Sequence, residues 1–584
     1  MVSKTNEEAL EDLIAAALTG ISPASRQADG GAALGETQPI YGPYDGYAPG
    51  HSQDFDAEYA IDKEYFWHFL EQTQPDQLDK LTNRPNWQRV LLDRLTRKIK
   101  KEGVLSVLKK GLSIDDAEFT LFYALPFNHD NPDLWTNFSD NIFSVTRQVH
   151  YSQSDPSLSL DMVLFINGIA IATIELKNQW TGQNFTHAKK QYINDRDPAE
   201  TLLNFGRCLV HFALDTDEVW MTTKLAGEKT FFLPFNKGHN HGKGNPVNIS
   251  THKSAVPHLE KQRWDSASVG EQSGAPEKSG GHRSAYLWEE VLQRESLAAI
   301  IQHFVLLEGK QKDALGKKTM IFPRYHQLDV VRKLLAHAQA HGSGERYLIQ
   351  HSAGSGKSHS ITWTAFQLIE LYHDQAKIGS SPYQGEAGRG SSFAPKVFDS
   401  IIVVTDRRAL DKQLSDNIRA FSEVKNVVAH AERSRDLRAA LESGKRIVIT
   451  TIQKFPFIMD EIEDLSDRTF AVIIDEAHSS QGGRAADKMN ISLGINLPNT
   501  KAGPSTEADE DVNENSDADS GATDAAPEPS LNQDRILSYM AGRKQGPNVS
   551  YFAFTATPKN STLEKFGERQ ADGSFRPFHL YSMK

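Results

Sequence analysis

The spacing of apolar residues divides the first 235 residues into helices followed by strands. Apolar positions recur at helical spacing in AIDKEYFWHFLEQ (60–72) and NWQRVLLDRLTRKIKKEGVLSVLKKG (86–111), which predicts amphipathic helices. From about 118 to 235, apolar runs between turn residues predict strands. These runs are FTLFYAL, NIFSVTRQVHY, SLDMVLFINGIAIATIEL, EVWMTT and KTFFLPF. The Asn-Gly pair in FINGIA predicts a type I′ hairpin, and helical stretches around 186 to 214 complete one compact α/β domain.

After residue 286 the pattern changes to buried strands that are separated by helical segments. The strands are RYLIQHS, SIIVVTD, RIVITTI, FAVIIDEAH and VSYFAFTAT. Strands that alternate with helices predict a parallel, doubly wound sheet. Residues 376–396 and 497–535 have the composition of disordered surface insertions in that sheet.

The remaining segments predict the domain boundaries. Residues 1–60 combine a short acidic amphipathic helix with an extended arm rich in Gly, Pro and Tyr, and residues 236–285 have the composition of a linker. We therefore expect a first α/β domain over 61–235, a second over 286–560, and the start of a further domain over 561–584.

Composition and charge change this picture little. A chain of 584 residues is too long for one core, and it has no apolar run long enough to span a bilayer. The N-terminus lacks the basic start and cleavage site of a signal peptide, so we expect a cytoplasmic protein. The single cysteine, Cys208, excludes an internal disulfide framework and a cysteine-built zinc site. Ten acids and no Lys or Arg lie in 502–534, so the net charge of −12 leaves about −2 elsewhere and does not exclude a DNA partner.

A glycine-rich loop, HSAGSGKS (351–358), follows a predicted strand and opens a predicted helix. Backbone N–H groups of such a loop, together with the positive end of the helix, cradle nucleotide phosphates. Lys357 would reach the β- and γ-phosphates, and the Ser358 hydroxyl would bind Mg²⁺. His351 stands where the strict pattern has glycine. Taken alone, the loop could therefore be structural.

Two further motifs end buried strands. In VIIDEAH (472–478), Asp475 would hold Mg²⁺ through water, and Glu476 would orient and deprotonate the attacking water. FTATP (554–558) ends a third strand. Ligands bind at the carboxyl ends of strands in doubly wound sheets. Three such motifs in this order predict an ATP site.

These residues resemble the first motor domain of superfamily 2 helicases and translocases. The resemblance is carried by three motifs: Ala353, Gly354, Ser355, Gly356, Lys357 and Ser358; Asp475, Glu476, Ala477 and His478; Thr555, Ala556 and Thr557. It implies that Thr555 and Thr557 couple ATP hydrolysis to nucleic-acid movement. It also implies that Gln327 in PRYHQLDVV reads adenine, although this glutamine could be a residue of a helix surface. Arg407, Thr451 and Gln453 are candidates for contact with the nucleic-acid backbone, or polar residues at ordinary helix starts.

The hairpin MVLFINGIAIATIELKNQW (162–180) brings charged residues into an apolar setting. Glu175 and Lys177 point to the same side of a strand, and pairing across Asn167-Gly168 brings Asp161 on the preceding strand close to Glu175. Two adjacent carboxylates repel unless a cation lies between them. Mg²⁺ accepts such ligands, and a nearby lysine can position the attacking water. The arrangement predicts phosphodiester cleavage; the alternative is an ion pair on an exposed sheet edge.

A nuclease domain joined to a superfamily 2 motor resembles the restriction (R) subunit of type I restriction-modification enzymes. The resemblance rests on segments such as DLWTNFSDNIFSVTRQVHY, RCLVHFALDTDEVWMTT, TFFLPFNKG and FTATPKNSTLEKFG. It implies a PD-(D/E)xK-type nuclease followed by a RecA-like motor, with ATP and Mg²⁺ as cofactors. The expected partners are duplex DNA and methylation (M) and specificity (S) subunits. Asp161, Glu175 and Lys177 would then cleave DNA. The family's Gln and Tyr lie a helical turn apart; here Gln191 and Tyr192 are adjacent and Asp195 takes the later position, so Gln191 is the candidate.

The resemblance also sets expectations about completeness. Motors of this superfamily hydrolyse ATP between two similar domains, and the second supplies an arginine. We expect the chain to be an N-terminal piece that is inactive as a motor alone. Two other functions stay open: a stand-alone nuclease-helicase of DNA repair, and a non-enzymatic remnant or assembly module.

Overall fold

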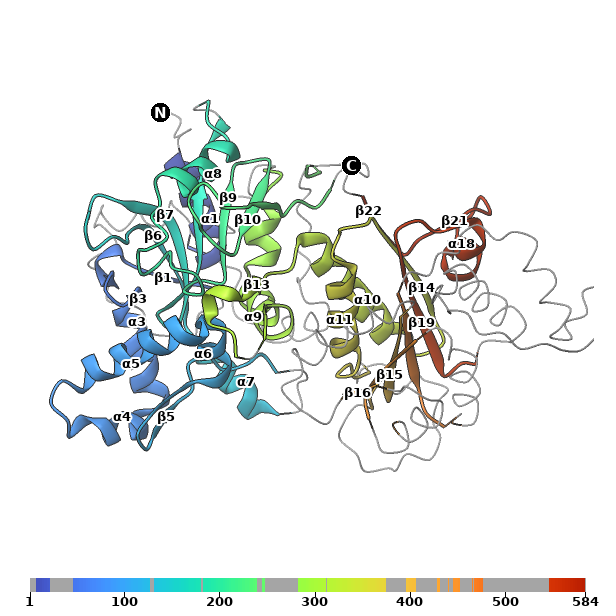
Figure 1. The fold of residues 1–584 in the computed structure, drawn as a ribbon, viewed down its shortest axis with the longest axis horizontal. Coiled ribbons are helices and arrows are strands. Elements are labelled where there is room, and N and C mark those ends of the chain that lie inside the picture. Colours follow the sequence, from blue (N-terminus) through green and yellow to red (C-terminus); the bar gives the residue numbers. More distant parts are fainter. Residues whose placement is uncertain are drawn as a thin grey trace, which may run out of the picture.

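A computed structural model describes most of the first predicted α/β domain and about half of the second, and the two lie side by side in Figure 1. The described residues are 7–21, 46–126, 131–179, 182–238, 244–246, 282–310, 312–373, 395–405, 428–430, 440, 445–451, 465, 467–475 and 546–582. The predicted insertion at 497–535, almost all of that at 376–396, and most of the predicted linker lie outside them. No described helix is long and apolar enough to cross a membrane.

The N-terminal domain is built on a nine-stranded mixed sheet with the order β1-β6-β7-β8-β9-β10-β11, to which β2 and β3 attach. Its strands are β1 (Ala48–Pro49), β2 (Phe55–Asp56), β3 (Ile61–Asp62), β6 (Phe143–His150), β7 (Ser159–Ile166), β8 (Ile169–Leu176), β9 (Val210–Leu214), β10 (Val219–Thr222) and β11 (Leu233–Pro234). A separate hairpin pairs β4 (Leu112–Ile114) with β5 (Ala117–Phe119). The helices are α1 (Glu7–Thr19), α3 (Lys63–Thr73), α4 (Pro75–Thr82), α5 (Trp87–Glu102), α6 (Val104–Lys110), α7 (Pro132–Ser139) and α8 (Phe185–Asn194), with a 3-10 turn η1 (Ser52–Asp54).

The central hairpin β7–β8 forms around the predicted Asn-Gly turn. Both turn residues have positive φ, 51° at Asn167 and 73° at Gly168, as a type I′ turn requires. A side chain at Gly168 would collide with the Asp62 carbonyl, because a Cβ there would lie 2.4 Å from that oxygen. Strand β8 then pairs in parallel with β9, and the connection between them contains α8. The turn starts this pairing, and a register shift between Leu164 and Phe165 then pairs Met162 with Ile174, which brings Asp161 beside Glu175.

Several parts of the sequence prediction differ from this fold. The helical stretches expected around 186–214 include strand β9, whose buried apolar residues pair with β8, and only Leu233–Pro234 of KTFFLPF forms a strand. Most of FTLFYAL is not a strand, because side chains replace the backbone ladder: Gln74 hydrogen-bonds both backbone groups of Thr120, and Asn141 does the same for Tyr123. The described part of the predicted arm also belongs to the N-terminal sheet, since β1 pairs in parallel with β6. Residues 46–60 are therefore better grouped with the first domain.

A buried carboxyl at the start of α3 makes the stability of this domain depend on pH. Asp62 is 1% exposed; its Oδ1 accepts the Tyr65 N–H at 3.1 Å, while Oδ2 has no hydrogen-bond partner among the described residues. Burial raises the pKa of Asp62 to about 7. Between the ordinary pKa of an aspartate and that value, unfolding releases a proton, so the free energy of unfolding falls as pH rises.

We expect Asp62→Asn to flatten this pH dependence. Asparagine keeps the acceptor for the Tyr65 N–H but cannot ionise, whereas the wild type loses at most about 4 kcal/mol across the titration. The measurement is the midpoint of thermal unfolding at about pH 5 and about pH 8. An equal fall in both proteins would contradict the assignment.

The second domain contains a seven-stranded sheet with the order β16-β17-β15-β18-β19-β14-β22, in which every described pairing is parallel. Its strands are β14 (Arg346–His351), β15 (Ser400–Thr405), β16 (Val428–His430), β17 (Ile447–Thr451), β18 (Phe470–Ile474), β19 (Val549–Thr555) and β22 (His579–Tyr581). Two hairpins, β12 (Leu306–Glu308) with β13 (Thr319–Ile321) and β20 (Glu568–Arg569) with β21 (Phe575–Arg576), lie outside it. The helical segments are η4 (Leu287–Val291), α9 (Arg294–His303), η5 (Leu315–Lys317), α10 (Tyr325–His341), α11 (Lys357–Leu368) and α18 (Asn560–Phe566).

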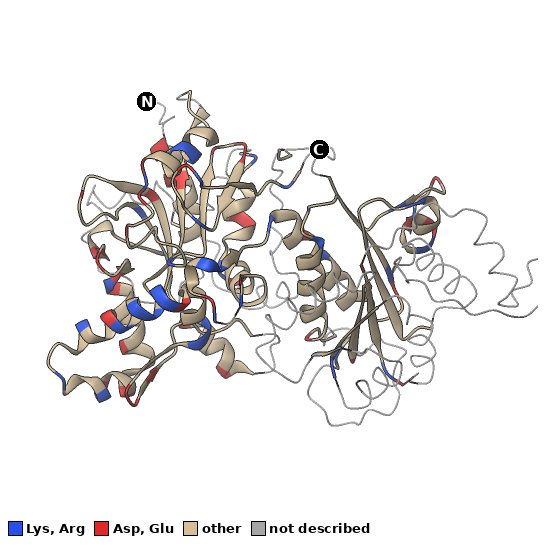
Figure 2. Ribbon diagram, viewed as in Figure 1, with Lys and Arg blue, Asp and Glu red and all other residues tan. Residues whose placement is uncertain are grey.

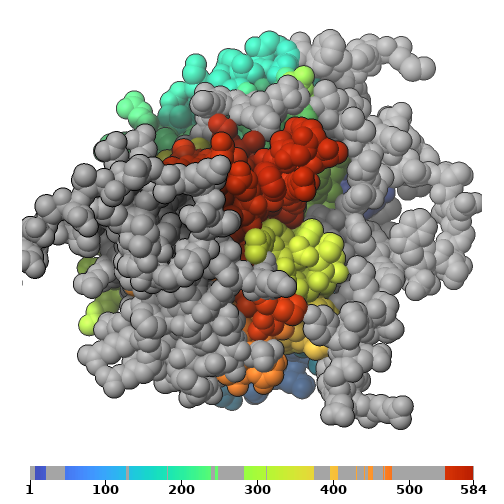
Figure 3. Space-filling model, turned by 90° about the vertical axis from the view of Figure 1, so that its right-hand side faces the viewer, coloured from blue at the N-terminus to red at the C-terminus, as the bar shows by residue number. Residues whose placement is uncertain are grey.

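The predicted parallel sheet is confirmed, but its last strand lies beyond the expected boundary at residue 560. Strand β22 pairs in parallel with β14, the strand that leads into the glycine-rich loop. In Figure 3, residues 546–582 (red) accordingly lie against the yellow-green stretch around α10 and β14. Residues 579–581 are thus part of this parallel sheet and not of a separate domain.

Candidate active sites

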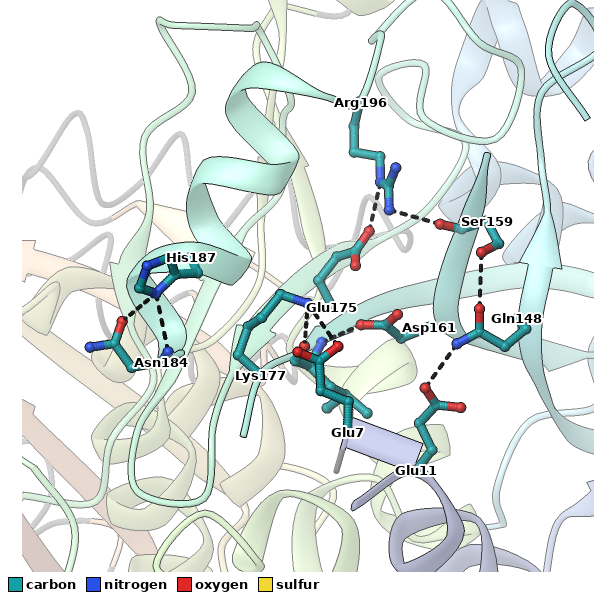
Figure 4. Close-up of polar contacts among 11 residues, drawn as sticks. Glu7, Glu11, Gln148, Ser159, Asp161, Glu175, Lys177, Asn184, His187 and Arg196 are labelled. Carbon is teal, nitrogen blue, oxygen red and sulfur yellow. Dashed lines mark hydrogen bonds and ion pairs between the residues drawn. The ribbon is translucent and has the colours of Figure 1, made fainter. Parts of the chain in front are cut away.

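The predicted carboxylate pair forms at the end of the β7–β8 hairpin opposite its turn. Figure 4 shows Asp161 on β7 facing Glu175 on β8, with Lys177 just beyond. Asp161 Oδ2 accepts the Leu176 N–H at 2.7 Å, which fixes the orientation of this carboxylate. Asp161 and Lys177 are each 8% exposed and Glu175 is fully buried. The alternative of an exposed edge pair is therefore excluded.

Burial and mutual repulsion make the carboxylate pair receptive to a cation. Burial, and next the charge of Asp161, raise the pKa of Glu175 well above its ordinary value. Arg196 offsets part of this cost, since its Nε donates to Glu175 Oε1 at 2.7 Å and its Nη2 donates to the Ser159 carbonyl at 2.7 Å. Glu175 Oε2 is buried without a hydrogen-bond partner among the described residues. A divalent cation fits an orphaned carboxylate oxygen beside a second carboxylate.

The site does not by itself complete a coordination sphere. Among the described residues, no group of three or more His, Cys, Asp or Glu side chains is arranged to hold a metal ion. Mg²⁺ usually keeps several waters and takes one or two carboxylates from the protein. Asp161 and Glu175 match that requirement.

Helix α1 supplies two acids that the sequence patterns did not identify. Lys177 Nζ donates to Glu7 Oε2 at 3.1 Å and to the Leu176 carbonyl at 2.8 Å. Glu11 Oε1 accepts from Gln148 Nε2 at 2.8 Å, and burial followed by the charge of Asp161 raises the pKa of Glu11 to about 7. The only signal was an acidic first turn on an amphipathic helix, which gives no indication that α1 packs against β6 and β8.

A cavity of about 430 Å³ opens beside α1. Its polar lining comes from Glu8, Glu11, Thr19, His51, Ser52, Arg147 and Gln148. Since Glu11 belongs both to this lining and to the surroundings of Asp161, the cavity lies next to the carboxylate pair.

Helix α8 positions the last nuclease candidates. Asn184 and His187 form a capping box that starts the helix, as Figure 4 shows. Gln191 is half-buried, and its Oε1 is buried without a hydrogen-bond partner among the described residues. Tyr192 is fully buried instead, with its hydroxyl 2.7 Å from Thr173 Oγ1. Its role is structural.

The glycine-rich loop connects β14 to α11 as predicted. Gly354 and Gly356 have φ values of 77° and 83°, and a Cβ at Gly356 would lie 2.4 Å from Gln327 Nε2. Helix α11 begins at Lys357, which is 9% exposed. Glycine is therefore required at these positions, as in a phosphate-binding loop.

The start of α10 holds the loop through its carbonyl groups. Arg324 Nη2 donates to the Gly354 carbonyl at 3.0 Å, and Gln327 Nε2 donates to the Gly356 carbonyl at 3.0 Å. His326 Nε2 lies 2.9 Å from the Ser355 carbonyl. Three side chains of one helix end thus fix three successive peptide groups of the loop.

The strand order gathers the other motor motifs beside this loop. Strands β18, β19 and β14 are neighbours and parallel, so Asp475 after β18 and Thr555 at the end of β19 lie at the same edge as the loop. Asp475 is 6% exposed, Thr555 is fully buried and Thr557 is exposed. Ser358 is half-buried in the first turn of α11, and Ala353 is exposed in the loop. Of the remaining candidates, Thr451 ends β17, whereas Glu476, His478, Arg407 and Gln453 lie outside the described residues.

His351, which departs from the strict loop pattern, is part of a buried chain of hydrogen bonds. Its Nε2 lies 2.8 Å from His579 Nδ1 on β22, and His579 Nε2 lies 3.0 Å from Asp329 Oδ2 on α10. Burial, and then the charge of His579, lower the pKa of His351 well below its ordinary value. Although burial opposes it, hydrogen bonding from His579 lowers the pKa of Asp329 to about 2. A neutral imidazole thus ties the nucleotide loop to the edge strand.

Replacing Gln327 by alanine is expected to weaken the binding of both ATP and GTP. The side chain holds the Gly356 carbonyl of the loop, and loss of such a hydrogen bond costs about 1 kcal/mol, roughly fivefold in affinity. Calorimetric titration with each nucleotide is the measurement. A larger loss for ATP than for GTP would reveal an additional contact with adenine, whereas unchanged binding of both would contradict the role in positioning the loop.

Comparison with known proteins agrees with this two-part architecture. Residues 54–230 match the family described as type I restriction enzyme R protein N terminus, and residues 395–500 match the SWI2/SNF2 ATPase family. A Methanocaldococcus jannaschii protein assigned as the type I restriction enzyme MjaVIIIP endonuclease subunit is 24% identical over 454 residues, which are 74% of this chain and 36% of that protein.

One further curated protein and one solved structure are also similar to parts of this chain. A Mycoplasma pneumoniae protein assigned as the C-terminal part of the type I restriction enzyme MpnIIP endonuclease subunit is 26% identical over 150 residues, covering 24% of this chain and 60% of that protein. The crystal structure of the UvsW helicase from bacteriophage T4 is 12% identical and covers 50% of this chain and 68% of that one, with a TM-score of 0.25. A TM-score this low does not indicate a shared fold. The chain spans only about a third of the M. jannaschii relative.

Proposed function

Because this chain combines the N-terminal domain of type I restriction enzyme R proteins with a SWI2/SNF2 ATPase region, we propose that it cleaves and translocates DNA within a type I restriction-modification enzyme. The observation that carries the proposal is the buried Asp161–Glu175 pair with Lys177, in the same chain as the Lys357 loop. Its substrate would be duplex DNA, and its partners would be methylation and specificity subunits in the cytoplasm.

In the nuclease site, Asp161 and Glu175 would hold Mg²⁺ through their carboxylate oxygens. When bound, the ion supplies Lewis-acid polarisation of the phosphate and lowers the pKa of a water. Arg196 keeps Glu175 in place, and Gln191 on α8 can orient the water or the substrate. The Lys177 ammonium would exchange Glu7 for the scissile phosphate, to which it offers a positive charge.

In the motor site, the loop from Ala353 to Gly356 would cradle the phosphates of ATP, and Lys357 would contact the β- and γ-phosphates. Ser358 and Asp475 would hold Mg²⁺, and Glu476 would activate the attacking water. Gln327 would position the loop through the Gly356 carbonyl. His478, Thr555 and Thr557 would link the nucleotide state to DNA movement.

The experiment that tests the proposed function is cleavage by the assembled enzyme. Combined with methylation and specificity subunits, the R subunit containing this chain should cut unmethylated duplex DNA only when ATP and Mg²⁺ are both present. Cleavage that ignores ATP, or assembled subunits that never cut, would contradict the proposal.

A further inference from the structure

A strongly basic surface covers α5 and its neighbours. Residues 84–110 contain nine Lys or Arg and only two acids, Asp93 and Glu102, in a chain whose net charge is −12. Figure 2 shows Lys and Arg concentrated along this part of the N-terminal domain. Such a local excess calls for a physical reason, because like charges on one surface repel.

The geometry of α5 separates an apolar face from a basic one. Leu91, Leu92, Leu95 and Ile99 are buried. The three exposed cations Arg94, Arg97 and Lys101 are spaced by three and four residues, so they share the opposite face. Arg89 and Lys100 flank them and are exposed too. We call these five residues the α5 basic face.

The cations of this face differ in their contacts from other cations nearby. Lys98 and Arg84, which lie outside the face, contact the rest of the domain: Lys98 donates to the Gly111 carbonyl at 2.8 Å, and Arg84 pairs with Asp115. By contrast, within the described ranges the side chains of the α5 basic face form no hydrogen bond or ion pair. The two nearby acids leave this surface with a net positive charge; Asp93 accepts from the Tyr59 hydroxyl, and Glu102 from the Ser106 hydroxyl.

A segment distant in sequence extends the same surface. The turn η5 packs on α5, with Leu315 against Gly103. Lys312 and Lys317 beside that turn are exposed, and Lys224 Nζ donates to the Gly316 carbonyl at 3.3 Å. The fold therefore brings Lys312 and Lys317, and also Lys224, near the end of α5.

The surface lies away from the nuclease centre. Asp161 and Glu175 sit at the end of the β7–β8 hairpin near α1 and α8, whereas the Asn167–Gly168 turn at the other end packs against Phe66 of α3. In Figure 1, α5 lies at that far end of the domain. A ligand held on α5 is therefore not a substrate phosphate at Asp161.

We propose that the α5 basic face binds the phosphate backbone of duplex DNA at a site separate from the nuclease centre. The inference rests on the proposed function, which supplies DNA as the partner. Unpaired, long cationic side chains without an apolar anchor suit a polyanion, since protein interfaces have an apolar core depleted of charge. Val90 on α5 is 39% exposed, and one valine is too small to form the apolar core of a protein interface. The site would hold DNA on the enzyme while the nuclease centre is engaged or idle.

The test is the salt dependence of DNA binding by the triple variant Arg94→Gln, Arg97→Gln and Lys101→Gln. Each phosphate contact contributes about 0.9 to the slope of log affinity against log salt, so the variant should lose about 3 in slope and bind at least tenfold more weakly at low salt. The matched control, Lys229→Gln, Arg569→Gln and Arg576→Gln, removes three exposed charges elsewhere. It should keep the wild-type slope. Thermal unfolding of both variants should match the wild type, because the side chains are exposed.

Three outcomes would overturn the inference: an unchanged slope in the α5 variant, an equal loss in the control, or a loss of binding to polyglutamate with DNA binding intact. The last would point to an acidic protein partner instead. Failure of the proposed function looks different. The assembled wild-type enzyme would then not cleave DNA, while the α5 variant would still bind duplex DNA more weakly than the control.

Discussion

Glu175→Gln is expected to reduce DNA cleavage by the assembled enzyme at least about a hundredfold. Losing a residue that hydrogen-bonds a metal ligand costs roughly 10- to 100-fold in activity. Glu175 would be a metal ligand itself, so its loss should cost more. Glutamine keeps the shape of the side chain but removes the charge that would bind Mg²⁺ and pair with Arg196. ATP binding should be unchanged, since the Lys357 loop belongs to the other sheet. The measurement is the initial rate of plasmid cleavage at saturating ATP.

Two further variants keep this prediction informative. Glu118→Gln removes an exposed carboxylate of the same domain and should cleave as the wild type does. If Glu175→Gln lowers the unfolding midpoint, Lys177→Gln provides a substitute, because its partner Glu7 is partly exposed and the pair adds little stability. Wild-type cleavage rates in both Glu175→Gln and Lys177→Gln would refute the nuclease assignment.

Lys357→Ala is expected to abolish ATP binding by this chain. The ammonium would make charge-assisted hydrogen bonds to the phosphates worth about 1.5 to 3 kcal/mol each, so losing two weakens affinity by roughly two to four orders of magnitude. Titration calorimetry with Mg-ATP is the measurement. Lys229→Ala, an exposed lysine of the N-terminal domain, is the control and should bind normally.

Unchanged affinity in Lys357→Ala would show that the glycine-rich loop does not hold the nucleotide. A stable fold is expected in the variant, because the hydrogen bonds from Arg324 and Gln327 to the loop carbonyls remain in place. The same thermal unfolding midpoint in variant and wild type therefore accompanies the predicted loss.

Local patterns in the sequence were enough to predict which residues lie close together when they are near in the chain. The Asn167-Gly168 turn and the twofold period of strands predict that Asp161 lies near Glu175. A register shift between Leu164 and Phe165, which the pattern did not predict, sets the final pairing. The loop before α11 is similar, because Gly354 and Gly356 mark the required left-handed conformations. The order of the parallel strands then collects the motor motifs at one edge.

Contacts between distant segments could not be predicted in this way. Arg196 reaches Glu175 only because α8 ends beside β8, and Glu7 reaches Lys177 only because α1 packs on the sheet 170 residues away. The buried His351 side chain has a hydrogen-bond partner only because β22 brings His579 beside it. The strand expected in FTLFYAL was lost to the side chains of Gln74 and Asn141, whose competition with the ladder has no periodic signal.

One comparison tests most directly the claim that a single chain carries two independent chemistries. DNA-stimulated ATP turnover and DNA cleavage should be measured together in assembled enzyme carrying Glu175→Gln. The account predicts that turnover stays within about twofold of the wild type, since the sites lie on separate sheets, while cleavage falls to background. Cleavage at the wild-type rate, or loss of ATP turnover in a folded variant, would contradict it.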